Sequence, residues 1–300
     1  MLILSFQDHY SNPPDFAFTH SEWHWSDDYG VTDNIDNATW VIDCTSTHIF
    51  LPNQGRTVEV AAPPTHLVWL SRRQGIAARL WAAPFINAAG VWRPLRACLG
   101  MDDWKLTWYS RGVLIAHWLQ HHRFCAACGS QLVPDSGLAQ KCSQDNCART
   151  FFPRIDPAII TTITNARGEL LLARQAHWPA NRFSVIAGFV MPGETVEQSV
   201  KREVMEETGL TIHSCRYVAS QPWPFPSSLM LAFDAYTQEI DIHPNDQELE
   251  TIAWFSAPVL MKKIQSGELI VGGQGSISRF LIHRWLEQHL AQHTRANSDE

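Results

Sequence analysis

Three glutamates in the second half of the chain, Glu203, Glu206 and Glu207, have a spacing that could gather their carboxylates. Residues at i, i+3 and i+4 lie on one side of an α-helix, so one helix would bring all three together. At about 100° per residue, Glu203 and Glu207 fall on the same side as Val196, which should face the interior. Partly buried like charges repel, and a divalent cation with oxygen ligands, Mg²⁺ or Mn²⁺, would compensate them. The spacing therefore predicts a metal site for phosphate chemistry; the alternative is a surface helix in which Arg202 pairs with Glu206.

The residues around these acids supply the signals that start and end a helix. Pro192-Gly193 marks a turn, and Thr195 with Gln198 three residues later has the form of a capping box. Gly209 stands where a C-terminal cap is expected, and no Gly or Pro interrupts the segment before it. The sequence therefore predicts one uninterrupted helix that positions the glutamates.

Four cysteines near the middle of the chain form a second chemical pattern. Two residues separate the first pair, thirteen follow that pair, and four lie within the second pair. A CxxC pair turns both thiolates towards one ion, and a second pair completes a tetrahedral Zn²⁺ site. Four thiolates leave no open coordination position, so the single Zn²⁺ should be structural. A redox dithiol and chance clustering are the alternatives, and the expected ligands are Cys125, Cys128, Cys142 and Cys147.

The composition limits the classes of protein to which the chain can belong. It has 300 residues, of which 45% are hydrophobic, and a formal net charge of -7. Such a chain can bury real cores, and its acidity argues against broad binding to nucleic acid. Seven cysteines are too few for a secreted disulfide framework. The zinc segment is locally basic, which keeps a local RNA contact open, through Arg123, Lys141, Arg149 and Arg154.

No targeting or membrane segment is expected. The N-terminus lacks the basic region and the long apolar run of a signal peptide. No stretch approaches the roughly 18 apolar residues of a membrane span, and the last residues are not a peroxisomal tripeptide. We therefore expect a cytoplasmic protein with no membrane partner.

The chain is expected to divide into four parts. Residues 1–110 predict an α+β accessory domain without a catalytic constellation, and residues 111–152 predict a connecting helix followed by the zinc ribbon. Residues 153–292 alternate strands and helices that must cover both faces of a sheet, which predicts an α/β/α sandwich with a mixed sheet. Residues 293–300 predict a flexible tail.

Residues 153–292 contain a proline-rich segment between two expected strands. Three prolines in five residues within Ser220–Ser228 exclude strand and helix there. They predict a stiff loop that holds Trp223 and Phe225, and a loop used only for packing is the alternative. The expected strands are 157–164, 169–174, 182–187, 211–220, 229–236 and 251–255, and the expected helices are 257–265 and 278–289.

Two of these segments resemble a known family. The order of Gly188, Glu194, Arg202-Glu203-Val204, Glu206-Glu207 and Gly209-Leu210 is similar to the signature of the Nudix hydrolases at every defined position. The loop sequence SQPWPFPSS that begins at residue 220 is similar to the mark of the NADH pyrophosphatase subgroup. A zinc ribbon and an additional N-terminal domain belong to the same subgroup. The resemblance is specific between the first cysteine and this loop and thin before residue 110.

This resemblance implies a metal-dependent activity on a dinucleotide. It implies hydrolysis of the pyrophosphate of NAD(H) to nicotinamide mononucleotide and AMP, and removal of the NAD cap from RNA 5′ ends. It also implies a homodimer. Two alternatives stay open: a Nudix hydrolase of another substrate, such as ADP-ribose or a dinucleoside polyphosphate, and an RNA-binding protein with a vestigial Nudix fold.

The resemblance also implies roles for individual residues. Glu207 is expected to act as general base or to hold the ion that activates water. Two or three Mg²⁺ or Mn²⁺ ions are expected on Glu203, Glu206, Glu207 and Glu248. Aromatic residues expected to sandwich a base are Phe152 and Phe189. Residues expected to line the dinucleotide pocket are Gln221, Ser228, Met230 and Ser278, and those expected to support the site are Gly188, Glu194 and Arg202.

Overall fold

The computed structural model describes most of the chain in two compact units. The described residues are 30–32, 40–52, 64–71, 76–84, 90–100, 105–243 and 248–296. The first unit contains Asp156–Gln221 and the described chain from Leu229 on. The second contains the described chain up to Ile155 together with Pro222–Ser228. The predicted boundaries at 110, 152 and 292 remain predictions.

The first unit is built on one central sheet. Its strands follow the order β14-β15-β10-β11-β16, and β13 also pairs with β10. The pairs of β10 with β11 and β13, and of β11 with β16, are antiparallel. The bounds are β10 Asp156–Thr164, β11 Leu170–Gln175, β13 Ile186–Phe189, β14 Ser214–Trp223, β15 Ser228–Tyr236 and β16 Leu249–Phe255.

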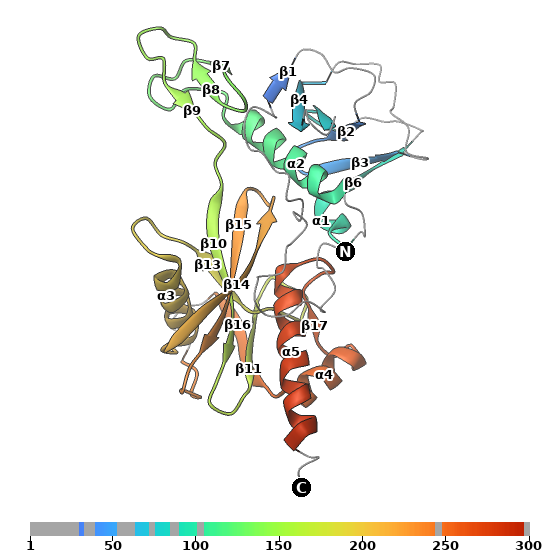
Figure 1. Cartoon of the computed structure of the whole chain (residues 1–300), viewed down its shortest axis with the longest axis vertical. Helices are drawn as coiled ribbons and strands as arrows, with labels where there is room; N and C mark the ends of the chain where they lie inside the picture. The colour runs from blue at the N-terminus through green and yellow to red at the C-terminus, as the bar shows by residue number, and fades with distance from the viewer. Residues whose placement is uncertain are drawn as a thin grey trace. The chain divides into compact units, whose positions relative to one another are not determined.

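Helices cover both faces of this sheet, because its central strands are apolar on both sides. In β11, Leu171 packs with the core under α3, and Leu172 packs with the core under α4 and α5. Figure 1 shows α3 on one face and α4 and α5 on the other. The predicted α/β/α sandwich is therefore confirmed, and its helices are α3 Val196–Thr208, α4 Ala257–Ser266 and α5 Ile277–Ala296.

The signals at the two ends of α3 act as predicted. The Thr195 hydroxyl accepts from the Gln198 amide at 3.2 Å, and the Thr195 amide donates to the Gln198 side chain at 2.8 Å. Gly209 ends the helix in the left-handed conformation with φ of 73°, which a glycine adopts without strain. The helix that carries the acids is therefore fixed at both ends.

Two sequence predictions in this unit need correction. The strand expected at 182–187 is split, and β12 (Arg182–Phe183) leaves the main sheet to pair in parallel with β17 (Ile270–Val271). The loop expected from Ser220 is shorter, because β14 continues through Pro222 to Trp223. β14 lies at the edge of the sheet, where a proline does not remove a needed ladder hydrogen bond.

The second unit contains a six-stranded sheet in the order β1-β4-β5-β2-β3-β6. Pairs β2/β3, β3/β6, β1/β4 and β4/β5 are antiparallel, and β2/β5 is parallel. The bounds are β1 Gly30–Thr32, β2 Trp40–Cys44, β3 His48–Pro52, β4 His66–Ser71, β5 Ile76–Leu80 and β6 Gly90–Pro94, followed by α1 Leu95–Cys98. The expectation of an α+β region is confirmed for these residues.

Helix α2, Lys105–His121, is a core element rather than only a connector. Tyr109 is buried and donates its hydroxyl to the Phe50 carbonyl of β3 at 3.1 Å. A Cβ at Gly112 would lie 2.8 Å from Cys44 Sγ, so the helix packs closely on β2. The helix thus begins six residues before the predicted Arg111, because its first turns cover this sheet.

Three short antiparallel strands, consistent with the predicted zinc ribbon, follow α2. They are β7 Leu132–Pro134, β8 Gln140–Cys142 and β9 Thr150–Phe151. At the other end of the chain, α5 continues through residues 293–296, and 297–300 lie outside the described residues. Among the residues described, no helix has the length and apolarity to cross a bilayer.

Candidate active site

Arg202, in the middle of α3, is the centre of an ion-pair network. Its Nε lies 2.6 Å from Glu194 Oε1 and its Nη2 lies 2.9 Å from Glu194 Oε2. Its Nη1 contacts Glu203 Oε1 at 2.8 Å and Glu206 Oε2 at 2.9 Å. Its Nη2 also donates to the Phe189 carbonyl at 2.8 Å. One guanidinium therefore fixes the loop after β13 to the helix and orients two of its carboxylates.

The three acids of α3 differ in exposure as the helical spacing predicts. Glu207 is 5% exposed, and the Glu203 side chain is 14% exposed. The Glu206 side chain is 54% exposed. The surface-helix pairing of Arg202 with Glu206 is present, yet two acids still face inward. Burial raises the pKa of Glu203, and the adjacent Arg202 opposes that rise.

The acids supply the chemistry of a divalent-metal site. Carboxylate oxygens are the ligands that Mg²⁺ and Mn²⁺ prefer. Gly188 leaves room for one of them, because a Cβ there would overlap the Glu203 carboxyl. Among the described residues, however, only the four cysteines bring three or more ligand atoms within 4.8 Å of one another. The donor set fits a hard cation, and the joint coordination by Glu203, Glu206, Glu207 and Glu248 stays a prediction.

The fourth predicted acid lies on the segment that leads into β16. Glu248 is exposed and directly precedes that strand. Its neighbour Glu250 forms an ion pair with the buried Arg174 of β11. Arg174 also donates to the Trp178 carbonyl at 2.7 Å. The ion pair of Glu250 joins β16 to β11, which favours Glu248 over Glu250 as the predicted metal ligand. Asp246 lies outside the described residues.

Gln221 and Ser278 were both predicted to line the pocket, and each lies at the start of α5: Gln221 bonds its first residue, Ile277, and Ser278 is its second. Gln221 is buried, donates to the Gly275 carbonyl at 2.8 Å and accepts from the Ile277 amide at 2.8 Å. Ser278 is also buried, and its hydroxyl lies 2.7 Å from the Ser184 hydroxyl. Gln221 therefore uses its amide to hold the α5 terminus. Ser184 was not foreseen, because an isolated serine has no signal in the sequence.

The other predicted pocket residues are less closely grouped. Met230 is half-buried against the core under α4 and α5, and Ser228 is buried. Phe189 is 56% exposed at the end of β13. Phe152 is 70% exposed just after β9 and belongs to the second unit. A base sandwich between Phe152 and Phe189 therefore stays a prediction.

The aromatic loop makes a contact that sequence reasoning missed. The rings of Trp223 and Phe225 are 5.0 Å apart in an edge-to-face arrangement. The Arg96 guanidinium lies 4.4 Å from the Phe225 ring and 5.3 Å from the Trp223 ring. Cation–π contacts of this kind hold aromatic rings in place. Nothing near Arg96 in the sequence indicated this pairing.

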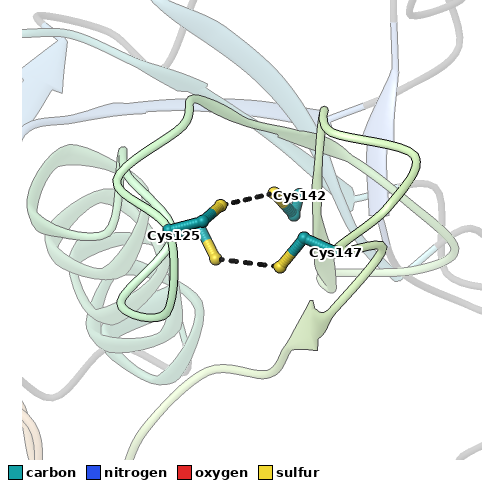
Figure 2. Close-up of side chains that lie close together, drawn as sticks. Cys125, Cys142 and Cys147 are labelled. Carbon is teal, nitrogen blue, oxygen red and sulfur yellow. Dashed lines mark hydrogen bonds between the residues drawn. The ribbon is translucent and has the colours of Figure 1, made fainter.

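The four cysteines converge as a tetrahedral metal site requires. Cys125 Sγ lies 3.7 Å from Cys147 Sγ, and Cys128 Sγ lies 3.4 Å from Cys142 Sγ. A tetrahedral ion with Zn–S bonds of about 2.3 Å separates its sulfurs by about 3.8 Å. Figure 2 shows the labelled side chains of Cys125, Cys142 and Cys147 pointing towards a common centre. All seven cysteines of the chain are free thiols, so a disulfide does not explain this cluster.

Comparison with known proteins identifies the family. A profile of the NUDIX domain matches residues 154–270. The NAD-capped RNA hydrolase NudC of Chromobacterium violaceum is 41% identical over 57% of this chain and 64% of its own length. The protein of the same name from Mycobacterium bovis is 35% identical over 77% of this chain and 79% of its own length. A crystal structure of a NUDIX hydrolase from Nitrosomonas europaea is 18% identical over 56% of this chain and 93% of that one, with a TM-score of 0.45. The chain belongs to the Nudix hydrolase family.

Proposed function

We propose that this protein hydrolyses the pyrophosphate of NAD(H) to nicotinamide mononucleotide and AMP, and removes the NAD cap from RNA 5′ ends. The observation that carries the proposal is the inward-facing pair Glu203 and Glu207 on a helix that Arg202 joins to the preceding loop. The relatives from C. violaceum and M. bovis, both named NAD-capped RNA hydrolases, support the choice of substrate.

The residues of α3 have two proposed roles, binding metal ions and transferring a proton. Glu203, Glu206 and Glu207, with Glu248 from the β16 side, are the groups that would hold Mg²⁺ or Mn²⁺. When bound, such ions lower the pKa of water and neutralise charge on the diphosphate. Glu207 is buried, so it is the carboxylate best shielded from bulk water and our candidate for general base. Arg202 keeps Glu203 in position through the Nη1 contact of 2.8 Å.

The residues predicted to line the dinucleotide pocket are suited to a nucleoside. Phe189 offers an exposed ring, and such a face can stack on a base. Gln221 fixes the start of α5 and thereby the position of Ser278. Met230 adds an adaptable apolar surface.

The cysteine cluster would hold one Zn²⁺ with a structural role. Its four sulfurs fill every position of a tetrahedral ion, so it offers no place for substrate. We also expect a homodimer, as the family resemblance implies, and we propose that the protein is cytoplasmic. The expected dimer is testable by molar-mass measurement in solution.

Product analysis tests the proposed function. The protein is incubated with Mg²⁺ or Mn²⁺ and with NADH, ADP-ribose or NAD-capped RNA at matched concentrations. We expect NADH to give reduced nicotinamide mononucleotide and AMP, and capped RNA to give nicotinamide mononucleotide and a 5′-monophosphate end. A preference for ADP-ribose over both other substrates would refute the proposal.

A further inference from the structure

One face of the zinc ribbon presents a row of exposed side chains. Val133 pairs with Lys141, and Lys141 pairs with Thr150. Residues directly opposite each other in antiparallel strands point to the same face. All three are exposed, whereas Leu132 and Cys142, which pair in the next row, are buried. The ribbon therefore has one face towards the cysteine cluster and one face towards solvent.

Aromatic rings lie at both ends of this row. Phe124 forms an antiparallel bridge with Gln131, and Gln131 is two residues from Val133, so Phe124 shares the outward face. Its ring is 62% exposed, and the Arg123 guanidinium lies 5.8 Å from its centre. Phe152, two residues beyond Thr150, is 70% exposed. We name the surface formed by Phe124, Val133, Lys141, Thr150 and Phe152 the ribbon face.

The charge of the ribbon differs in sign from that of the whole chain. Between residues 122 and 155 four basic residues stand against two acidic ones, a net charge of +2 in a chain of net charge -7. The basic residues are exposed. Lys141 is the cation at the centre of the face, because it pairs with Val133 on one side and with Thr150 on the other. Asp135, one of the two acids, accepts from the Thr150 hydroxyl at 3.5 Å. The ribbon thus carries a net positive charge within an acidic chain.

We infer that the ribbon face binds the single-stranded RNA that follows the NAD cap. This inference rests on the proposed function and names the surface that receives the RNA chain. Exposed rings on a small sheet, interleaved with cations, stack bases and contact phosphates without requiring a particular sequence. Phe124 supplies the stacking ring, and Arg123 and Lys141 supply the phosphate contacts. Free NADH has no RNA chain, so these three residues add nothing to its hydrolysis.

A pair of variants at Phe124 tests the stacking contact. Phe124→Ala should lower kcat/KM for an NAD-capped RNA with a single-stranded end of about 12 nucleotides by about tenfold or more. The kcat/KM for NADH should stay within about twofold of wild type, since NADH has no RNA chain to stack on Phe124. Phe124→Trp keeps a ring and should retain the activity on capped RNA. Bound zinc, measured per chain, should be equal in all three proteins, because Phe124 is exposed.

A second pair of variants tests the phosphate contact. The slope of log(kcat/KM) against log(salt) is negative, and each lost phosphate contact makes it less negative by about 0.7 for a single strand. Lys141→Gln should reduce the steepness of the slope for capped RNA by this amount and leave the slope for NADH unchanged. Lys262→Gln removes an equally exposed lysine from α4 in the other unit. That control should leave the slope unchanged.

Four outcomes would overturn the inference. Unchanged kcat/KM for capped RNA in Phe124→Ala, or an equal fall with NADH and capped RNA, would show that the face does not act on the RNA chain. A fall in molar mass to that of a monomer in Phe124→Ala would assign the face to contact between copies of the chain. Failure of the wild type to cleave capped RNA while it cleaves NADH would refute both the cap activity and this inference. The first three results would refute the role of the ribbon face but leave the proposed cap activity intact. Failure of this inference is therefore distinguishable from failure of the proposed function.

Discussion

Gly188 lies directly against the carboxyl group of Glu203, and a Cβ at position 188 would overlap it. Gly188 belongs to β13 and pairs with Ile159 of β10, so its backbone is fixed by the sheet. Glu203 is fixed from the other side by Arg202 at 2.8 Å. The glycine of this motif is therefore needed for space beside a carboxylate, and not for an unusual backbone conformation.

Replacing this glycine should damage the site without unfolding the protein. In Gly188→Ala the Glu203 carboxyl must move out of its position, and we expect kcat/KM for NADH to fall at least about tenfold, as for a misplaced catalytic group. Gly273→Ala is the matched control, because a Cβ at Gly273 meets nothing within 4 Å. Steady-state assays at saturating Mg²⁺ and thermal unfolding are the measurements. Equal activity of the two variants would contradict the role of this contact.

Removing the charge of Glu207 should remove turnover but not binding. Glu207→Gln keeps the shape of the buried side chain, and we expect kcat to fall at least about a hundredfold, the range of a general base. Dissociation constants for the dinucleotide should change little. Glu197→Gln removes an exposed acid from the first turn of the same helix and should be near wild type. Near-normal turnover in Glu207→Gln would exclude this residue from the chemistry.

Much of α3 could be predicted, because its signals are local. Thr195, Gln198 and Gly209 cap the helix through residues within one turn of each end, and the positions of Glu203 and Glu207 follow from the helical period. The cysteine cluster was predictable for a similar reason, since metal ligands have characteristic spacing.

Contacts between distant segments could not be predicted in this way. Arg96 stacks on Phe225 although the two are far apart in sequence, and no local pattern specifies such a pair. The extension of β14 through Pro222 depends on the strand lying at the sheet edge. That position is a property of the whole topology, which the order of residues near Pro222 does not contain.

Glu194 should make stability depend on pH in the acid range. Hydrogen bonds from Arg202 and Ser199 lower the pKa of Glu194 from 4.5 to about 2. A lowered folded-state pKa contributes stability above the unfolded value, and this contribution is lost as the pH falls from 4.5 towards 2. Glu194→Gln removes it. The difference in free energy of unfolding between wild type and Glu194→Gln, measured with urea, should therefore be largest above pH 4.5 and shrink below it. A difference that does not vary with pH would contradict the assigned ion pair.

The ribbon should depend on its metal for folding. Its buried apolar residues are few, and the cluster around Leu132 consists mainly of cysteines and Phe151. We expect about one Zn²⁺ per chain, because four sulfurs bind one tetrahedral ion. Cys142→Ser should lose this zinc and expose the ribbon to proteolysis, since metal binding supplies folding free energy. Cys215→Ser, a cysteine outside the cluster, should keep the zinc. Full zinc content in Cys142→Ser would refute the site.

Gln221 should affect stability by holding the start of α5, and should affect substrate binding only as a consequence. Its side chain satisfies both the Gly275 carbonyl and the Ile277 amide at 2.8 Å, in a buried position. Gln221→Leu fills a similar volume but leaves both groups unpaired, so we expect a loss of about 1–3 kcal/mol in the free energy of unfolding. The freed α5 terminus should also shift Ser278 and raise the KM for NADH. Gln265→Leu, an exposed position on α4, controls for the added apolar side chain. A higher KM with wild-type stability would mean that Gln221 acts on the substrate directly rather than by holding the helix.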